Sequence, residues 1–492
     1  MKKTLIALLL LIAMMMNVLI LSGCDLLLGD KTNDGDEWNN EEVEGKINIT
    51  FYHTMGANLR TVLNEYLAKF EAQYPNIHVI HEQVGSYDDV RTQIATELTQ
   101  GGGPNLAYCY PDHVALYNVA KAVKVLDDLI DGGASTTKAG IMADGTVANL
   151  GLTAEEKADF IEGYYNEGKQ FGDDKMYTMP FSKSTEVLYY NQTKFEEWAA
   201  KYAETGDEKY NIKVPTTWDE MEEVCEKILA IDPECTPLGY DSESNWFITM
   251  CEQLNIPYTS AENGGEFLFN NPEAKAFVKR FREWYQKGYV TTQELNGGYT
   301  SGLFVAPTTG PHSYMSIGSS AGATHQRPSK DSTGNYPFVV GIAPIPQANP
   351  EAPKVISQGP SICILDDTDE KVEASWLLVK YLTTNAAFQA DFSIASGYVP
   401  VIKSVENDDV YIDEAAKANG GDGIAALSTK VCLEQANAYY TSPAFNGSSA
   451  ARDQVGALMQ ACFKIPDGAD IDAEMDKLFA AAISECNRLA GK

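Results

Sequence analysis

The sequence predicts an α/β protein built from more than one lobe. Short runs with the alternation of strands are followed by segments whose apolar residues recur at helical spacing. This order is expected of a mainly parallel sheet flanked by helices. The chain has 492 residues, of which 44% are hydrophobic. That length exceeds what one hydrophobic core usually supports, and the apolar content is far above that of a disordered chain.

The first strand and helix units are predicted directly after residue 46. Residues 47–52 alternate with a period of two, which favours a strand, and residues 59–74 carry apolar side chains at helical spacing. Residues 77–80 are predicted to form a second strand and residues 90–98 a second helix.

Later segments continue the same alternation. Residues 338–343 and 361–365 have the apolar content of buried strands, and residues 371–383 have helical periodicity. From residue 415 the chain is predicted to be rich in helix.

The charge balance excludes one large class of function. The chain carries 37 basic and 69 acidic side chains, for a formal net charge of −32. Nucleic-acid binding needs a dense set of Lys and Arg facing phosphates, and the sequence has no basic stripe. We therefore expect no nucleic-acid partner.

The first residues have the order of a secretory signal. Lys2 and Lys3 precede an unbroken apolar run, which ends in Leu21-Ser22-Gly23-Cys24. This ending resembles the lipobox of bacterial lipoproteins, in which cleavage before the cysteine leaves its thiol diacylated. We expect residues 1–23 to be a lipoprotein signal peptide and Cys24 to carry the lipid. The alternative is an uncleaved membrane anchor, because residues 4–22 are about long enough to span a bilayer.

An acidic tether is predicted at residues 24–46. Residues 25–45 contain eight acids and one base, Lys31, and such a segment does not bury a core. The rest of the chain would then lie outside the cytoplasm, held at the cell membrane by its lipid.

The cysteine pattern does not predict a disulfide framework. Eight cysteines remain after Cys24, and no pair has CxxC spacing. An even number in an exported protein permits disulfides. Most of these cysteines stand in apolar contexts, so we expect buried free thiols.

Tests for an enzyme find no catalytic constellation. Residues 318–322 match G-x-S-x-G, but a nucleophile elbow needs an acid and then a histidine further along the chain. The one histidine after Ser320 is His325, with no acid between them. His78 and His81 would point to opposite faces of a strand, so we expect no metal pair there. No nucleotide-binding glycine motif is present, and no cofactor is expected.

Four stretches, in order after the lipobox, resemble the extracytoplasmic solute-binding proteins of ABC importers. They are Ile49-Thr50-Phe51-Tyr52-His53-Thr54-Met55, the crossover segment at 179–191, Pro215-Thr216-Thr217-Trp218-Asp219-Glu220 and Ser396-Gly397-Tyr398-Val399-Pro400. The resemblance extends from about residue 47 to the C-terminus. It implies two α/β lobes joined by crossing strands, with a hinge and a ligand cleft between the lobes.

The resemblance also implies how the chain is divided. We expect residues 47–155 and 312–367 to form the N-terminal lobe, and residues 156–311 and 368–492 to form the C-terminal lobe.

Within this family the sequence resembles the binders of glycerol-3-phosphate and glycerophosphodiesters. That likeness implies polar contacts from Tyr87 and Ser184, an apolar wall from Trp218, hydroxyls from Ser319 or Ser320, a backbone contact at Gly359, and closure of Tyr398 and Arg452 on a phosphate. Where those binders carry a glutamate, this chain has Tyr110-Pro111-Asp112, and Asp112 could substitute for it.

Each of these positions also has a simpler interpretation. Trp218 could be a hydrophobic contact at a helix start, and Gly359 could occupy a turn that requires positive φ. Tyr87 and Tyr398 could be packed tyrosines, and Arg452 a surface ion-pair residue.

The expected function is capture of a sugar or a glycerol-3-phosphate-type solute and its delivery to the transmembrane subunits of an ABC permease. The protein is expected to be a lipid-anchored monomer on the extracytoplasmic face of the cell membrane, without catalysis. The alternative is a secreted glycan hydrolase that uses a carboxylate pair in the cleft, because one sequence does not reveal the separation of its carboxylates. A surface adhesin would need exposed patches that a sequence does not show.

Overall fold

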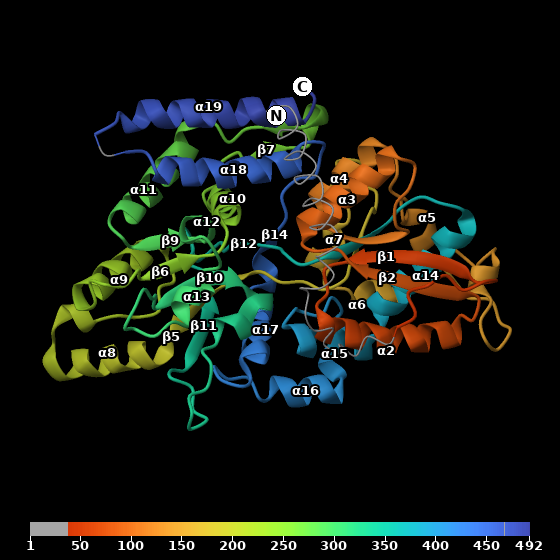
Figure 1. Ribbon diagram of the computed structural model, residues 1–492, viewed down its shortest axis with the longest axis horizontal. Coiled ribbons are helices and arrows are strands. Elements are labelled where there is room, and N and C mark those ends of the chain that lie inside the picture. Colours follow the sequence, from red (N-terminus) through yellow and green to blue (C-terminus); the bar gives the residue numbers. More distant parts are fainter. Residues whose placement is uncertain (1–37, 467) are drawn as a thin grey trace, which may run out of the picture. The chain divides into compact units, whose positions relative to one another are not determined.

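Two five-stranded sheets organise residues 40–492 in the computed structural model of the chain (Figure 1). The structure describes residues 38–466 and 468–492. The predicted signal peptide, Cys24 and the larger part of the tether therefore lie outside the described residues. Within the described residues, no helix is both long enough and apolar enough to cross a membrane.

The first sheet and its helices form what we call lobe 1. The strand order is β2-β1-β3-β13-β4, with β1 parallel to β2 and β3, and β13 antiparallel to β3 and β4. Its strands are β1 (Ile47–His53), β2 (Ile77–Gln83), β3 (Leu106–Cys109), β4 (Met179–Pro180) and β13 (Ser361–Ile364). Its main helices are α2 (Ala57–Gln73), α3 (Tyr87–Thr99), α4 (Pro111–Val119), α14 (Asp369–Thr384) and α15 (Ala386–Ser396).

Local sequence explains the first units of lobe 1. Strand β1 buries alternate apolar residues, and α2 buries Leu63, Tyr66, Leu67 and Phe70 at helical spacing. A capping box between Ser86 and Asp89 starts α3. The predicted strands at 47–52 and 77–80 and the helices at 59–74 and 90–98 are confirmed, with ends that differ by a few residues.

The second sheet and its helices form lobe 2. The strand order is β11-β5-β10-β6-β9, in which β5 is antiparallel to β10 and β11, and β6 is parallel to β10 and β9. Its strands are β5 (Glu186–Asn191), β6 (Leu238–Tyr240), β9 (Val290–Thr292), β10 (Met315–Ser319) and β11 (Val340–Pro344). Its main helices are α8 (Gln192–Thr205), α9 (Trp218–Ile231), α10 (Glu243–Gln253), α11 (Pro272–Gln286), α17 (Ile424–Glu434), α18 (Ser448–Phe463) and α19 (Ile471–Leu489).

Shorter elements connect these units. The short helices are α5 (Asp127–Ile130), α6 (Ala154–Asp159), α7 (Glu162–Glu167), α12 (Gln293–Asn296), α13 (Ser301–Phe304) and α16 (Asp409–Ala415). The 3₁₀ helices are η2 (Lys138–Gly140), η3 (Glu208–Tyr210), η4 (Glu262–Gly264), η5 (Ser320–Gln326), η6 (Lys403–Asn407) and η7 (Ala436–Ala438). Two small ladders pair β7 (Thr259–Ser260) with β8 (Glu266–Phe267), and β12 (Val355–Ile356) with β14 (Tyr439–Tyr440).

The sheets correct the predicted lobe boundaries. Strands β10 and β11 lie within the predicted N-terminal segment 312–367, yet both pair with β5 in lobe 2. Helices α14 and α15 lie within the predicted C-terminal segment 368–492, yet α14 packs against β1 and α15 against α2 in lobe 1. The boundary at 312 is therefore wrong, because hydrogen-bonding partners far along the chain decide where a strand belongs.

The chain passes between the lobes at residues 181–185, 345–360 and 397–423. These passages are hydrogen-bonded to one another. Lys183 forms a bridge with Val399, and Ser184 forms a bridge with Gln358. Three strands of connection thus lie side by side where the lobes meet, which is the position of a hinge.

The cores agree with the predicted state of the cysteines. Lobe 2 has a large aromatic core around Trp246, Phe281 and Trp284, and lobe 1 has its own cluster around Val90, Ile94 and Tyr117. All eight cysteines in the described part of the chain are buried free thiols. This confirms the expectation for those eight residues.

Candidate functional site

A cavity of about 570 Å³ is lined by both lobes and by the passages between them. Ligand pockets of small molecules usually have volumes of about 300–1,000 Å³. Its aromatic residues are Tyr87, Tyr110, Tyr299 and Tyr398, its carboxylates are Glu186 and Asp241, and its amides are Asn245, Gln293, Gln326 and Gln358. Among the described residues that line it there is no lysine or arginine.

Lobe 1 contributes tyrosines from the starts of its helices. Tyr87 is the first residue of α3, which the Ser86 cap holds in place, and Tyr110 is the N-cap of α4. The hydroxyl of Tyr87 lies 3.3 Å from that of Tyr398, which follows α15. Burial raises the pKa of all three phenols, so they remain neutral and act as hydrogen-bonding groups.

The hinge brings Ser184 and Gln358 to the same cavity. Their backbones exchange two hydrogen bonds of 2.9 and 2.8 Å. Gly359 follows with φ of +87°, and a Cβ at this position would lie 2.5 Å from the carbonyl oxygen of Ser182. A side chain at residue 359 would separate the passages, so the close approach requires glycine.

Lobe 2 contributes the carboxyl ends of β6 and β10. Asp241 follows β6, and its Oδ1 accepts hydrogen bonds of 2.7 Å from both the backbone and the hydroxyl of Thr300. Burial raises the pKa of Asp241, although these hydrogen bonds oppose the shift. On β10, Gly318 has no room for a Cβ, which would lie 2.7 Å from Asp241 Oδ2.

Glu186 opens β5, and its carboxylate is almost completely buried. Its Oε2 accepts a 2.6 Å hydrogen bond from the Tyr240 hydroxyl, and its Oε1 accepts a 3.1 Å bond from Asn245 Nδ2. Burial raises the pKa of Glu186 to about 7, and the two hydrogen bonds and the charge of Arg452 limit the rise. Glu186 is thus a hydrogen-bond acceptor whose charge changes close to neutral pH.

Arg452, in the first turns of α18, lies next to this group. Its Nη2 donates a hydrogen bond to Asn245 Oδ1, so Asn245 connects the guanidinium to Glu186. Arg452 also lines a smaller space of about 60 Å³ together with Asp112 and Glu167. Burial alone would raise the pKa of Asp112, but the positive groups of His113 and Arg452 hold it below the usual value.

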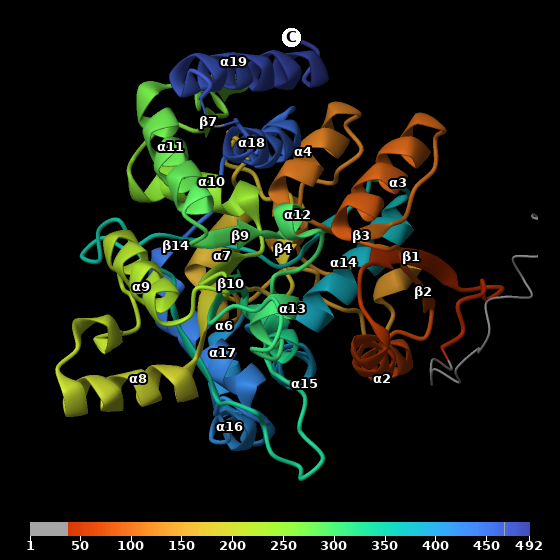
Figure 2. The ribbon, with the colours of Figure 1, turned by 60° about the vertical axis from the view of Figure 1, so that its left-hand side comes forward.

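An ion pair joins helices of the two lobes beside the site. Arg91 on α3 lies 3.5 Å from Asp453 on α18 and 3.2 Å from Asp88. Helix α18 also contacts α4, and Figure 2 shows these helices next to each other.

Six predicted ligand residues line the two neighbouring spaces. Tyr87, Ser184, Ser319 and Tyr398 line the larger cavity, and Asp112 and Arg452 line the smaller one. Of the two alternatives Ser319 and Ser320, Ser319 lines the cavity, whereas Ser320 is fully buried. Its hydroxyl accepts a 3.2 Å bond from the Thr185 backbone N–H.

Trp218 and Gly359 line neither of the two spaces. Trp218 is 2% exposed in the lobe 2 core, and its indole N–H donates a 2.8 Å bond to Gln253. A side chain enclosed in this way offers no wall to a ligand, which corrects the expectation. Gly359 is buried between the passages, and its carbonyl accepts a 3.3 Å hydrogen bond from Lys183 Nζ. Its placement fits the turn interpretation.

The prediction missed several polar groups of the cavity. Glu186 lies inside the crossover motif as an acid followed by the apolar residues of a buried strand, which is a signal in itself. Asp241 and Ser242 follow a strand and begin a helix, where Ser242 is the N-cap of α10. Gln358 carries no such signal, because its position depends on a bridge to a residue far away in sequence.

The two histidines of β2 have separate hydrogen-bond partners. His78 Nδ1 lies 2.8 Å from Glu71 Oε1, whereas His81 lies 2.9 Å from His53 and 2.8 Å from Asn64. These separate partners agree with the expectation that the two side chains face opposite ways.

Comparison with known proteins gives the family. The model for the bacterial extracellular solute-binding protein family matches residues 65–419. The sn-glycerol-3-phosphate-binding periplasmic protein UgpB of Escherichia coli strain K12 is 23% identical over 372 residues, which are 72% of this chain and 74% of that protein.

Solved structures with the same fold include two that differ in ligand. UgpB from Mycobacterium tuberculosis in complex with glycerophosphocholine has a TM-score of 0.66 at 17% identity and covers 90% of this chain and 98% of its own. The cyclic alpha-maltosyl-1,6-maltose binding protein from Arthrobacter globiformis has a TM-score of 0.65 at 16% identity and covers 91% and 99%. The fold is thus the two-lobed α/β architecture of periplasmic binding proteins, as predicted. With a cavity lined by both lobes and a family model that matches most of its length, the chain belongs to the bacterial extracellular solute-binding proteins.

Proposed function

We propose that this protein is the receptor of an ABC importer and that it captures a carbohydrate. The observation that carries the proposal is the lining of the 570 Å³ cavity, which combines tyrosines, carboxylates and amides with no lysine or arginine among its described residues. Sugar hydroxyls donate hydrogen bonds to carboxylate and amide oxygens, and aromatic faces cover the C–H faces of sugar rings.

The charge of the cavity supports a neutral solute. Asp241 and Glu186, which is ionised in part at neutral pH, both face the space, and the whole chain has a formal net charge of −32. A negative field of this kind opposes the approach of an anion. The structural relatives that bind maltose-type sugars agree with this choice of ligand.

A glycerol-3-phosphate-type solute is the second candidate, and one observation favours it. Arg452 lies at the smaller space beside the cavity, where a guanidinium could hold a phosphate bidentately. The relatives named for sn-glycerol-3-phosphate and glycerophosphocholine support this alternative.

The proposal includes a place in the cell and a partner. Residues 1–23 would be removed as a signal peptide, Cys24 would be diacylated, and the acidic residues of the tether would separate the two lobes from the membrane. The bound solute would pass to the transmembrane subunits of the permease. The protein would act as a monomer and perform no chemistry, and the comparisons give the alternative of a glycan hydrolase no support.

A thermal-shift panel tests the proposal. It compares maltose-type oligosaccharides, other neutral sugars, glycerol-3-phosphate and glycerophosphodiesters on the same preparation. A ligand that binds the folded state at 100 times its Kd adds about 2.7 kcal/mol to the free energy of unfolding. We expect a shift with at least one oligosaccharide and recovery of that sugar unchanged after incubation. Shifts with phosphate compounds alone would contradict the carbohydrate assignment, and turnover of the sugar would contradict the receptor.

A further inference from the structure

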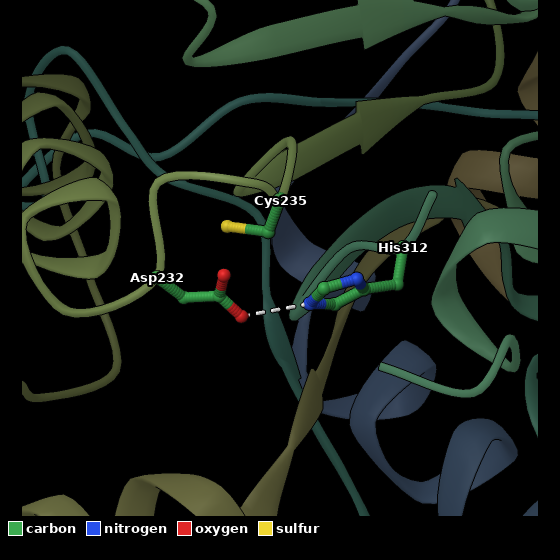
Figure 3. Close-up of side chains that lie close together, drawn as sticks. All are labelled: Asp232, Cys235 and His312. Atoms are coloured by element: carbon green, nitrogen blue, oxygen red, sulfur yellow. Dashed lines mark hydrogen bonds and ion pairs between the residues drawn. The ribbon is translucent and has the colours of Figure 1, made fainter. Parts of the chain in front are cut away.

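We propose that lobe 2 carries a binding site for a divalent transition metal of the zinc type, formed by Asp232, Cys235 and His312 (Figure 3). Nothing in the proposed solute-binding function requires it. Ligand atoms of the three side chains all lie within 4.8 Å of one another.

The site lies at the edge of the sheet that faces away from the solute. Asp232 is the C-cap of α9, Cys235 precedes β6, and His312 precedes β10. Strands β6 and β10 are parallel, so their starts meet at one edge, while their carboxyl ends reach the cavity with Asp241 directly after β6 and Ser319 at the end of β10. A metal here would bind independently of the solute.

The distances suit a tetrahedral ion after shifts of the side chains by about 1 Å. His312 Nε2 lies 2.9 Å from Asp232 Oδ2. Zinc bonds of about 2.0 Å to nitrogen and oxygen and about 2.3 Å to one sulfur give tetrahedral ligand-to-ligand separations of roughly 3.3–3.5 Å. The farthest pair of ligand atoms therefore needs to approach by up to about 1.3 Å, and Nε2 and Oδ2 need to separate by about 0.4 Å. Three protein ligands leave a fourth position for water.

The hydrogen bonds of His312 point to an ion. Its Nδ1 lies 2.7 Å from the carbonyl oxygen of Gly310, and its Nε2 lies 2.9 Å from the Asp232 carboxylate. Both neighbours are acceptors, whereas a neutral imidazole has one N–H. If Nδ1–H donates to Gly310, the lone pair on Nε2 faces a carboxylate oxygen. A proton on Nε2, which would make His312 an imidazolium, satisfies both atoms, and so does a metal cation bound to Nε2 and Oδ2. An Nδ1–H bond to a backbone carbonyl is the usual support of a metal-bound histidine.

A second group orients the carboxylate. The Tyr314 hydroxyl donates a 2.8 Å hydrogen bond to Asp232 Oδ2, and the Glu234 backbone N–H donates one of 3.3 Å to Oδ1. The side chain of His312 is 1% exposed and that of Asp232 is 23% exposed, so the carboxylate is the side from which an ion would enter.

The ligand types select the metal. A thiolate and an imidazole favour zinc and related transition metals, whereas magnesium and calcium prefer oxygen ligands throughout. On binding, the Cys235 thiol loses its proton to solvent and the sulfur becomes the third ligand. The ion would connect the end of α9 to the starts of β6 and β10.

Cobalt titration of the reduced, EDTA-treated chain tests the site, with Cys24 replaced by serine to remove the thiol of the lipobox. We expect one equivalent of Co²⁺ to produce a thiolate-to-cobalt charge-transfer band in the near ultraviolet, together with the intense visible bands of a tetrahedral ion. Zn²⁺ should abolish these bands by competition and raise Tm.

Three variants decide the ligands. Cys235→Ser should remove the charge-transfer band, and His312→Asn should weaken Co²⁺ binding at least tenfold. Cys462→Ser, which replaces another buried thiol of the same lobe, should leave both signals unchanged. One cooperative thermal unfolding transition of the metal-free protein, expected in all three, verifies that each variant is folded.

Two outcomes would overturn the site. One is the absence of a cobalt band in the Cys24→Ser chain at millimolar Co²⁺, which would leave an ordinary His312–Asp232 ion pair. The other is a band that survives in Cys235→Ser.

Discussion

The ammonium group of Lys183 lies 2.6 Å from the carboxylate of Glu167, and both side chains are almost completely buried beneath the hinge. Lys183 also donates hydrogen bonds to the Gly359 carbonyl at 3.3 Å and to the Ser361 hydroxyl at 3.0 Å. The other oxygen of Glu167 accepts a 2.9 Å bond from the Ser357 hydroxyl. One buried ion pair thus connects helix α7 with two of the passages between the lobes.

Replacement of either residue of this ion pair should lower the free energy of unfolding. Lys183→Met would leave the Glu167 charge buried without its cation, and such changes cost about 3–5 kcal/mol. Urea unfolding measures the loss. Lys194→Met is the matched control, since Lys194 lies 2.6 Å from Glu197 at the surface, where an ion pair is worth about 0–1 kcal/mol. Equal effects in the two variants would contradict the role of the hinge pair.

Glu186 should make stability fall as the pH rises towards neutrality. Its pKa is about 7 in the folded protein, against an ordinary value of 4.5. Between these values the folded protein keeps a proton that the unfolded chain has released, so the stabilisation is complete below pH 4.5 and is lost as the pH passes through 7. The difference corresponds to about 3 kcal/mol.

The measurement compares the wild type with Glu186→Gln, which is nearly isosteric and does not titrate. The free energy of unfolding is determined in urea from pH 4.5 to 8. Over this range it should fall by about 3 kcal/mol more in the wild type than in Glu186→Gln. Parallel curves would show that Glu186 is ionised throughout this range.

Arg452 should distinguish the two candidate solutes. Arg452→Met removes the charged donors, and a hydrogen bond to a charged group is worth about 1.5–3 kcal/mol, or roughly a 10- to 150-fold change in Kd. Binding of a phosphate compound should weaken by that factor, whereas binding of a neutral sugar should change less than about tenfold. Calorimetry measures both. Arg488→Met, at a surface ion pair with Glu485, is the control.

Tyr299 should contribute to sugar binding without contributing to the fold. It is 68% exposed and lines the cavity. Tyr299→Ala should raise the Kd for a sugar about 2- to 10-fold, since an aromatic contact is worth about 0.5–1.5 kcal/mol. Stability should change by less than about 0.5 kcal/mol. Tyr202→Ala on α8 should leave sugar affinity unchanged, and a similar loss there would rule out a specific contact.

Gly359→Ala should lower the stability of the protein much more than the replacement of another glycine with a similar φ by alanine. Gly145 has φ of +82° with nothing within 4 Å of an added Cβ, whereas Gly359 has φ of +87° and a Cβ there would meet Ser182 at 2.5 Å. Gly145→Ala should cost about 1–2 kcal/mol for its conformation alone. Gly359→Ala should cost about 1–3 kcal/mol more, because the passages must separate. Equal losses of Tm would place the passages farther apart than the structure has them.

Local pattern was sufficient where an element is defined by its own residues. Strand β1 and helix α2 were predicted correctly because their buried side chains repeat at the periods of a strand and a helix. The assignment of β10 and β11 to lobes failed, because β5 is their partner and the sequence does not state pairings. Among the site residues, Tyr87 and Arg452 were predicted from the family resemblance alone. The periodicity of the sequence does not show that both lie near the cavity.

Trp218 shows the limit of that resemblance. The residue is the first of α9, and the Thr217–Glu220 capping box turns the helix so that its indole enters the aromatic core. A motif can keep its capping residues while its tryptophan packs inwards. Conversely, Gln358 lies at the cavity because it pairs with Ser184, and Asn245 because it donates a hydrogen bond to Glu186. No local sequence pattern predicts these two contacts.

Two features would allow a fluorescent dye to report on movement between the lobes. The native thiols in the described part of the chain are buried, and Asp453 of lobe 2 forms an ion pair with Arg91 of lobe 1. A cysteine introduced at position 453 would be the accessible thiol among the described residues, because the eight native ones are buried. A dye attached there would stand where α18 of one lobe faces α3 of the other. Its fluorescence would register any relative movement of these helices, so the unknown solute could be sought by adding candidate mixtures to a single labelled protein.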